Sequence, residues 1–339
     1  MPSSLTLESS PLLAPQQRKR SRTTLILILA ALALPLSELV CRFVIGLGDP
    51  PLYQTDRYME YRLQPSKTYY RFHKRFSVNG YSMRADDFPP KKAIPNELRV
   101  LVVGDSVIYG GVRIDQNNID TEILKRNLQS EFHRPVTVGN AAAKSWGPPN
   151  EFGYLQVFGT LDADVVILEL SSHDYADAPT YVPVVGISAD YPDKKPTLAL
   201  FDLFETYLLP RYLHIGLTPP GVDKTLLTSS SSEQDITACR DAERNFFRFA
   251  RTHGAGVALM QHLTMPEVNG GYQAGYFANR SVAQEENVPH VDDSEDLRAH
   301  LNSGQNPFYP GDTLHVNDLG QTILAGALQK AVELALKTQ

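Results

Sequence analysis

From residue 98 onward, short apolar runs alternate with longer stretches in which apolar residues recur every three or four positions. The short runs are typical of buried strands and cover residues 99–103, 136–138, 165–170, 257–261 and 289–291. The longer stretches are typical of helices; they begin at Asp120 as N-cap, after Pro148-Pro149, near Ile236 and at Asn317 as N-cap. This alternation predicts an α/β fold, a three-layer α/β/α arrangement with a mainly parallel sheet of about five strands.

Before this region the pattern is different. A basic cluster at residues 18–22 precedes an apolar run over 25–36, and a second apolar stretch continues to Leu47 after Ser37 and Glu38. About 20 mainly apolar residues suffice to span a bilayer, so we expect a transmembrane anchor over residues 23–48 and a disordered cytoplasmic tail over residues 1–22. Glu38 and Arg42 are four positions apart, so they can pair on one helical face. The rest of the chain is then extracytoplasmic, and periplasmic if the cell is Gram-negative.

Two other interpretations of the N-terminal segment remain. Ala31-Leu32-Ala33 resembles a signal-peptide cleavage site, and a cleaved signal would export the same domain. A buried core helix is a further alternative, but the adjacent basic cluster disfavours it.

Residues 49–97 are rich in proline and tyrosine and lack a long periodicity. We expect them to form a collar or linker that packs on the main domain, although aromatic side chains interleaved with Arg and Lys could also bind a sugar chain. Asn79-Gly80 is typical of a tight hairpin turn. Within the main domain, over residues 98–339, the stretch 175–232 is too long for an ordinary connection. It predicts an insertion over the strand ends, with an amphipathic piece at residues 198–213.

Composition narrows the functional classes. The formal net charge of −6 and the isoelectric point near 5.9 disfavour a nucleic-acid-binding surface. The two cysteines, Cys41 and Cys239, lie far apart in different patterns, so neither a disulfide nor a cysteine-based zinc site is expected. The stretch from Gly104 to Gly111 matches neither phosphate-binding glycine motif. We therefore expect no cofactor.

Candidate chemistry begins at Ser106, which follows the first predicted sheet strand in Gly104-Asp105-Ser106. Functional groups of open α/β sheets lie just past the carboxyl ends of the strands. To act as a nucleophile, a serine hydroxyl needs a base, and the base needs an acid that orients it. Asp312 and His315 are three positions apart, so a single turn of the chain can bring the carboxylate to the imidazole. An Asp and a His at this spacing are a weak signal alone, and Ser106 could simply cap a turn.

Taken together, Gly104-Asp105-Ser106 and Asp312-Thr313-Leu314-His315, followed by Asn317 and Gly320, resemble the SGNH (GDSL-type) hydrolase superfamily. The resemblance covers about residues 98–336. It implies Ser106 as nucleophile, His315 as general base and Asp312 as orienting acid.

The resemblance also implies an oxyanion hole formed by the backbone N–H groups of Ser106 and Ala142 and by the His173 side chain. Ala142 stands where the family usually has glycine, and His173 stands where it usually has asparagine. Losing one such donor typically costs about 10²–10³ in rate. Asp105, Asn140 and Asp174 are the supporting residues of the same blocks.

A metal site made of Asp105, His173, Asp174, Asp312 and His315 is a competing interpretation, but no familiar ligand spacing supports it. A lone histidine such as His173 is also commonly a satisfied buried residue.

The resemblance, together with the predicted anchor, implies a membrane-anchored serine esterase acting on ester groups, O-acetyl above all, of envelope or exported polysaccharide. Alternatives are an O-acyltransferase to a sugar hydroxyl with the same triad, and a non-catalytic carbohydrate-binding or scaffold protein that contacts polysaccharide-export proteins. The polysaccharide substrate rests on analogy and location.

Overall fold

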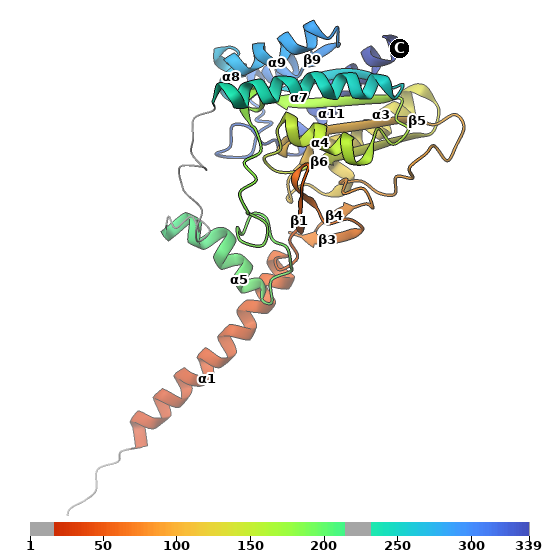
Figure 1. Cartoon of the computed structure of the whole chain (residues 1–339). Coiled ribbons are helices and arrows are strands. Elements are labelled where there is room, and N and C mark those ends of the chain that lie inside the picture. Colours follow the sequence, from red (N-terminus) through yellow and green to blue (C-terminus); the bar gives the residue numbers. More distant parts are fainter. Residues whose placement is uncertain (1–16, 214–231, 339) are drawn as a thin grey trace, which may run out of the picture.

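The computed structural model describes residues 17–213 and 232–338 (Figure 1). A five-stranded sheet has the order β6-β5-β7-β8-β9, and every neighbouring pair is parallel. The strands are β5 (Leu98–Gly104), β6 (Val136–Ala142), β7 (Val165–Ser171), β8 (Gly256–His262) and β9 (His290–Asp292). All residues of β5, β7 and β8 are buried, which explains why these strands are nearly continuous apolar runs in the sequence. The predicted fold class is confirmed.

Helices cover both faces of this sheet. On one face α3 (Asp120–Phe132) packs against α11 (Asp318–Lys337); on the other, α4 (Pro148–Phe158) packs against α7 (Glu233–Thr252), and α9 (Ala274–Glu285) contacts α7. Short helices lie between these elements: α2 (Ser106–Tyr109), η2 (Gln116–Asn118), η3 (Ser172–Ala176), α8 (Met265–Gly270) and α10 (Ser294–Asn302). The strand order reverses at β5, since β6 and β7 lie on its two sides, and such reversal points are where α/β sheets bind ligands.

The two predicted N-caps have different outcomes. The Asn317 side chain accepts hydrogen bonds from the N–H groups of Leu319 and Gly320, at 3.0 and 3.3 Å, so this prediction is confirmed. The cap of α3 is Ile119, one residue before the predicted Asp120. Asp120 is instead the first helical residue, and its N–H donates to the Gln321 side chain of α11 at 2.8 Å, so a tertiary contact satisfies this group.

The collar consists of two antiparallel hairpins, β1 (Tyr53–Asp56) with β2 (Glu60–Leu63) and β3 (Lys67–Arg71) with β4 (Lys74–Val78). The aromatic residues Tyr53, Tyr61, Tyr69 and Phe76 are buried in the main hydrophobic core. Their role is packing, as expected.

The hairpin turn predicted at Asn79-Gly80 is wrong. The turn lies at Phe72-His73, between β3 and β4, where both residues have positive φ, 51° and 60°. Two consecutive positive φ angles match the twist of the flanking strands, as in a type I′ turn. The Asn79 side chain instead accepts hydrogen bonds from the N–H groups of Tyr81 and Met83, which gives a local turn without a following strand.

The N-terminal helix α1 (Gln17–Leu39) continues into the π-helix η1 (Val40–Ile45). Residues 22–45 are long and apolar enough to cross a membrane, by length and composition. The helix starts before residue 23, so residues 17–22 of the expected disordered tail are helical; residues 1–16 lie outside the described part of the chain. The expected pair of Glu38 with Arg42 is present, at 2.7 Å.

Within the stretch 175–232, the amphipathic piece is helical, as α5 (Ala199–Leu203) and η4 (Phe204–Leu213). It lies beside the C-terminal end of α1 rather than over the sheet (Figure 1). Residues 214–231 lie outside the described residues.

Candidate active site

Ser106 lies where β5 ends and the short helix α2 begins. Asp105 is the N-cap of α2, and its Oδ1 accepts a hydrogen bond from the Val107 N–H at 2.7 Å. Gly104 allows the close packing beneath this turn, because a Cβ there would lie 2.7 Å from Glu169 Oε2 and 2.9 Å from Ile108 Cγ1. The serine hydroxyl is thus held at the carboxyl edge of the central strand.

His315 and Asp312 come from the loop before α11 and meet Ser106 there. His315 Nε2 lies 3.0 Å from Ser106 Oγ, and His315 Nδ1 lies 2.8 Å from Asp312 Oδ2. Both lengths are within the range of hydrogen bonds. The structure therefore brings together the three side chains that the sequence motifs selected.

The Asp312 carboxylate is held by its own loop. Its Oδ1 accepts hydrogen bonds from the N–H groups of Leu314 and His315, at 2.9 and 3.0 Å. Burial acts to raise the pKa of Asp312, but these two hydrogen bonds and the His315 imidazole outweigh it and lower the pKa below the ordinary 3.8. The ionised Asp312 accepts a hydrogen bond from the Nδ1–H of His315, so the neutral imidazole has its proton on Nδ1 and Nε2 is free to accept the Ser106 proton.

Two further residues that the sequence did not single out support this loop. His262, at the end of β8, is fully buried; its Nδ1 lies 2.5 Å from Asp293 Oδ2 and its Nε2 lies 2.9 Å from the Leu314 carbonyl oxygen. Burial acts to lower the pKa of His262, but the Asp293 charge and these hydrogen bonds outweigh it and raise the pKa above 6.5. When charged, the ring donates to both partners. The only signal in the sequence was that His262 and Asp293 each follow a predicted strand.

The supporting residue Asn140 is buried in β6, where its amide donates to the Ile108 carbonyl at 2.7 Å and to Thr121 Oγ1 at 3.1 Å. These bonds tie α2 and α3 to the sheet. Ala142 ends β6 and is buried, in register with Gly104 of β5.

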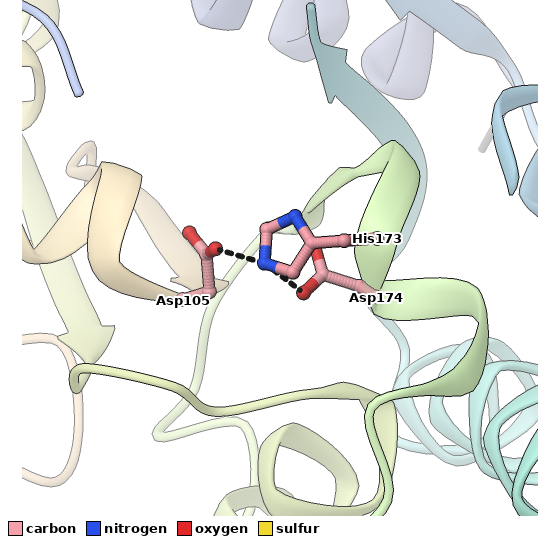
Figure 2. A group of neighbouring side chains, drawn as sticks. All are labelled: Asp105, His173 and Asp174. Atoms are coloured by element: carbon pink, nitrogen blue, oxygen red, sulfur yellow. Dashed lines mark ion pairs between the residues drawn. The ribbon is translucent and has the colours of Figure 1, made fainter. Parts of the chain in front are cut away.

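His173 lies on η3, just after β7, and lines the same cavity as Ser106. It is not a buried histidine, since 45% of its side chain is exposed. Its Nε2 lies 3.2 Å from Asp174 Oδ1 and 3.6 Å from Asp105 Oδ2. Figure 2 shows this nitrogen directed at both carboxylates, with the other ring nitrogen, Nδ1, on the far edge of the ring. Both carboxylate oxygens are buried and have no hydrogen-bond partner, and the His173 imidazole lies within ion-pair distance of each.

Carboxyl groups are concentrated beneath this histidine. Asp174, Glu169 and Glu151 are fully buried, and burial, reinforced by the nearby Asp105 charge, raises the pKa of each well above its usual range. Each of the three has at least one carboxyl oxygen without a hydrogen-bond partner. The neutral, protonated form is accordingly favoured for this group of side chains.

The five residues of the metal hypothesis do not form one cluster. Among the described residues, those with ligand atoms close enough to share an ion are Asp105, His173 and Asp174, within 4.8 Å of one another. Asp312 and His315 are paired with each other and with Ser106 instead.

A cavity of about 750 Å³ opens at the triad. Its lining combines aromatic and charged side chains from several elements: Tyr109, Arg113, Lys144, His173, Asp177, Asp190, Tyr191 and Tyr309, besides Ser106, Asp312 and His315. Asp177, Asp190 and Tyr191 belong to the predicted insertion, so this part of it does lie over the strand ends.

No family model matches the chain, and the search of curated proteins gave no match. Three solved structures illustrate what the fold is similar to. A two-domain esterase active on acetylated mannans, crystallised with mannopentaose, is 13% identical with a TM-score of 0.45; the match covers 71% of this chain and 50% of that chain. This chain thus spans about half the length of that esterase.

The second structure is a member of the lipolytic G-D-S-L family from Veillonella parvula, at 13% identity and a TM-score of 0.41, with 70% of this chain and 98% of that chain covered. The third is a catalytic mutant of an acetylxylan esterase from Geobacillus stearothermophilus, at 14% identity and a TM-score of 0.42, with 71% and 96% covered. At these levels the similarities say nothing about the activity of this chain, which has to be argued from its own site.

Proposed function

We propose that this protein is a serine esterase of the SGNH type, with Ser106 as nucleophile, His315 as general base and Asp312 as orienting acid. The observation that carries the proposal is the continuous chain of contacts from Ser106 Oγ to His315 Nε2, at 3.0 Å, and from His315 Nδ1 to Asp312 Oδ2, at 2.8 Å. This is the arrangement that activates a serine hydroxyl.

In the first half of the proposed reaction, Ser106 Oγ attacks the ester carbonyl carbon and its proton moves to His315 Nε2. The carbonyl oxygen becomes an oxyanion. When the ester C–O bond breaks, the leaving alcohol takes the proton from His315, and the acyl group remains on Ser106. Asp312 stabilises the imidazolium throughout.

In the second half, a water molecule gives its proton to His315 and attacks the acyl carbonyl. The bond to Ser106 Oγ breaks, the serine takes the proton back, and the acid leaves.

The oxyanion would be bound by the backbone N–H groups of Ser106 and Ala142 and by His173. Since His173 Nε2 is directed at Asp105 and Asp174, Nδ1 is the nitrogen available for an oxyanion. An imidazole with its proton on Nδ1 has an N–H donor there. In this proposal His173 donates that N–H to the oxyanion in place of the usual asparagine amide.

For the substrate we propose an acylated carbohydrate, and among such substrates we favour envelope or exported polysaccharide that carries O-acetyl groups. The cavity is large enough for a sugar unit, and Tyr191 and Tyr309 in its lining offer rings of the kind on which sugars pack.

For the location we propose a single-span anchor with its N-terminus in the cytoplasm and residues 49–339 outside, because the basic residues at 18–22 precede the apolar segment.

To test the proposal, the detergent-solubilised full chain is incubated with acetylated glycans, and the release of free acetate is measured by mass spectrometry. We expect acetate release that is abolished in Ser106→Ala. Ser145→Ala is the matched control. Ser145 lines the same cavity, but its hydroxyl accepts a hydrogen bond from Tyr191, so this variant should still release acetate. With an acetyl donor and unacetylated glycan, transfer of acetyl to the glycan would favour the acyltransferase alternative. No release and no transfer would contradict the proposal.

A further inference from the structure

The segment formed by α5 and η4, residues 199–213, exposes a row of large apolar side chains, with the exposed Glu205 on the same side. Phe201, Phe204 and Tyr212 expose 54%, 48% and 69% of their surface, and Leu208 exposes 37%. These positions are separated by three, four and four residues, so they lie along one side of a helix. Large aromatic side chains are seldom left exposed in such a row, and a row of this kind marks an interaction surface.

The opposite side of the same segment is fixed to the junction between anchor and domain. Asp202 forms a buried ion pair with Arg71 at 2.6 Å and accepts a hydrogen bond from the Gly48 N–H at 2.8 Å. Arg71 also donates to Tyr207 Oη at 3.1 Å. Ala199 packs in a small apolar cluster with Cys41 and Leu47. These contacts hold the row of exposed side chains in one orientation relative to α1.

The start of α5 is joined directly to the anchor. Both carboxylate oxygens of Glu38 accept hydrogen bonds at 3.0 Å, from the N–H groups of Ala199 and Leu200. These are N–H groups that the first turn of a helix leaves without partners. Glu38 therefore caps α5 from the anchor helix, while its other partner is Arg42.

The height of this junction follows from helix geometry. A hydrocarbon core about 30 Å thick is crossed by about 20 helical residues at about 1.5 Å per residue. A span that begins at Thr23 therefore ends near Arg42, which places Glu38 and Arg42 within about one helical turn of the outer boundary. In Figure 1, α5 branches off at this junction and runs to the side of α1 instead of continuing along it. A helix in that position lies at the level of the lipid headgroups.

The surroundings have the composition of a membrane interface. Tyr70, 60% exposed, lies beside the same junction, because its N–H donates to Asp49 at 2.7 Å. Lys195 pairs with Asp49 at 2.6 Å, and Lys194 and Lys195 line a groove together with Phe201 and Glu205. Aromatic side chains are enriched at the interface, and lysines near it attract anionic headgroups.

We propose that residues 199–213 form an interfacial helix that lies on the outer bilayer surface, with Phe201, Phe204 and Leu208 inserted among the lipids. The helix is a second membrane contact beside the anchor. Together the two contacts set the tilt of the domain and the height of its cavity above the membrane. This inference depends on the anchor and not on the proposed esterase activity.

The test uses tryptophan fluorescence of the full chain in vesicles of phosphatidylcholine and phosphatidylglycerol that carry bromine on the acyl chains near the headgroup. The one native tryptophan, Trp146, is 1% exposed in the core and serves as an internal reference. We expect Phe201→Trp and Phe204→Trp each to add an emission band that shifts to the blue in vesicles and loses intensity in the brominated lipid.

Two further variants make the result decisive. Phe277→Trp is the matched control, because Phe277 is 54% exposed on α9, away from the anchor, and its added emission should not be quenched (Figure 1). Leu29→Trp reports on the anchor itself, and lipids brominated near the chain ends should quench it more strongly. If the Phe201→Trp and Phe204→Trp variants behave like Phe277→Trp, the proposal is wrong. An unquenched Leu29→Trp would overturn it as well, since the anchor would then not be in the bilayer.

Discussion

The Nε2 atom of His262 lies 2.9 Å from the carbonyl oxygen of Leu314, the residue immediately before His315. This contact links a buried histidine of β8 to the loop that carries the proposed base. The Met265 N–H donates to the neighbouring Thr313 carbonyl at 2.8 Å, so two successive carbonyl groups of the loop are held from the end of β8. The position of His315 thus depends on groups that do not contact the cavity.

Asp293→Asn tests this support. The substitution removes the charge that keeps His262 protonated, and breaking a buried ion pair costs about 3–5 kcal/mol. We expect a loss of that size in the free energy of unfolding, measured by urea titration near pH 6. Glu295→Gln, an acidic residue on the exposed side of α10, is the control and should have little effect.

The same pair predicts a pH dependence of stability. The pKa of His262 is raised above 6.5 in the folded protein, so its stabilising contribution is complete below pH 6.5 and is lost as the pH rises through the folded pKa. The unfolding free energy of the unmodified protein should therefore decline over that range above pH 6.5. Asp293→Asn should show a weaker decline, and an equal decline in both proteins would contradict the assignment.

Asp312→Asn tests the orienting acid. An asparagine amide favours the wrong tautomer of His315, and in the comparable triad of other serine enzymes this change costs about 10⁴ in kcat. We expect a loss of that order in ester hydrolysis, with the fold retained. In the unmodified protein the pKa of Asp312 lies below 3.8, so its contribution to stability is present above that value and is lost as the pH falls through the folded pKa.

His173→Ala tests the oxyanion donor. We expect kcat to fall about 10²–10³-fold with little change in KM, because the donor acts on charge that develops in the transition state. His173→Asn, which restores an amide donor, should recover part of the rate. His253→Ala, at the exposed end of α7, is the control. A variant with lowered stability but unchanged kcat would show that His173 only covers the buried acids.

Gly104→Ala tests the packing beneath the nucleophile. The added methyl group would meet Glu169 Oε2 at 2.7 Å and Ile108 Cγ1 at 2.9 Å, and overpacking of this kind costs about 1–3 kcal/mol. We expect a lower free energy of unfolding together with slower hydrolysis. Gly326→Ala is the matched control: Gly326 lies in α11 with nothing within 4 Å of the added atom, so this change should stabilise the helix by about 0.5–1 kcal/mol.

The sheet and the triad could be predicted because their signals are local. Each buried strand is a short apolar run, and Ser106 and His315 occur in short motifs next to predicted element boundaries. The hairpin turn at Phe72-His73 could not be predicted from the sequence, because neither residue is a usual turn former. Asn79-Gly80 gave the stronger turn signal. His262 and Asp293 meet only when β8 and β9 pair, so no motif connects them. The contact of Glu38 with α5 joins distant segments and was equally hidden.

Covalent labelling of Ser106 tests the central claim most directly. The full chain is treated with a fluorophosphonate, digested with trypsin and analysed by mass spectrometry. The expected peptide, residues 100–113, contains Ser106 as its one serine. The account predicts an adduct on this peptide, absent in Ser106→Ala and strongly reduced in His315→Ala. An adduct on another serine, or no adduct on the folded protein, would contradict it.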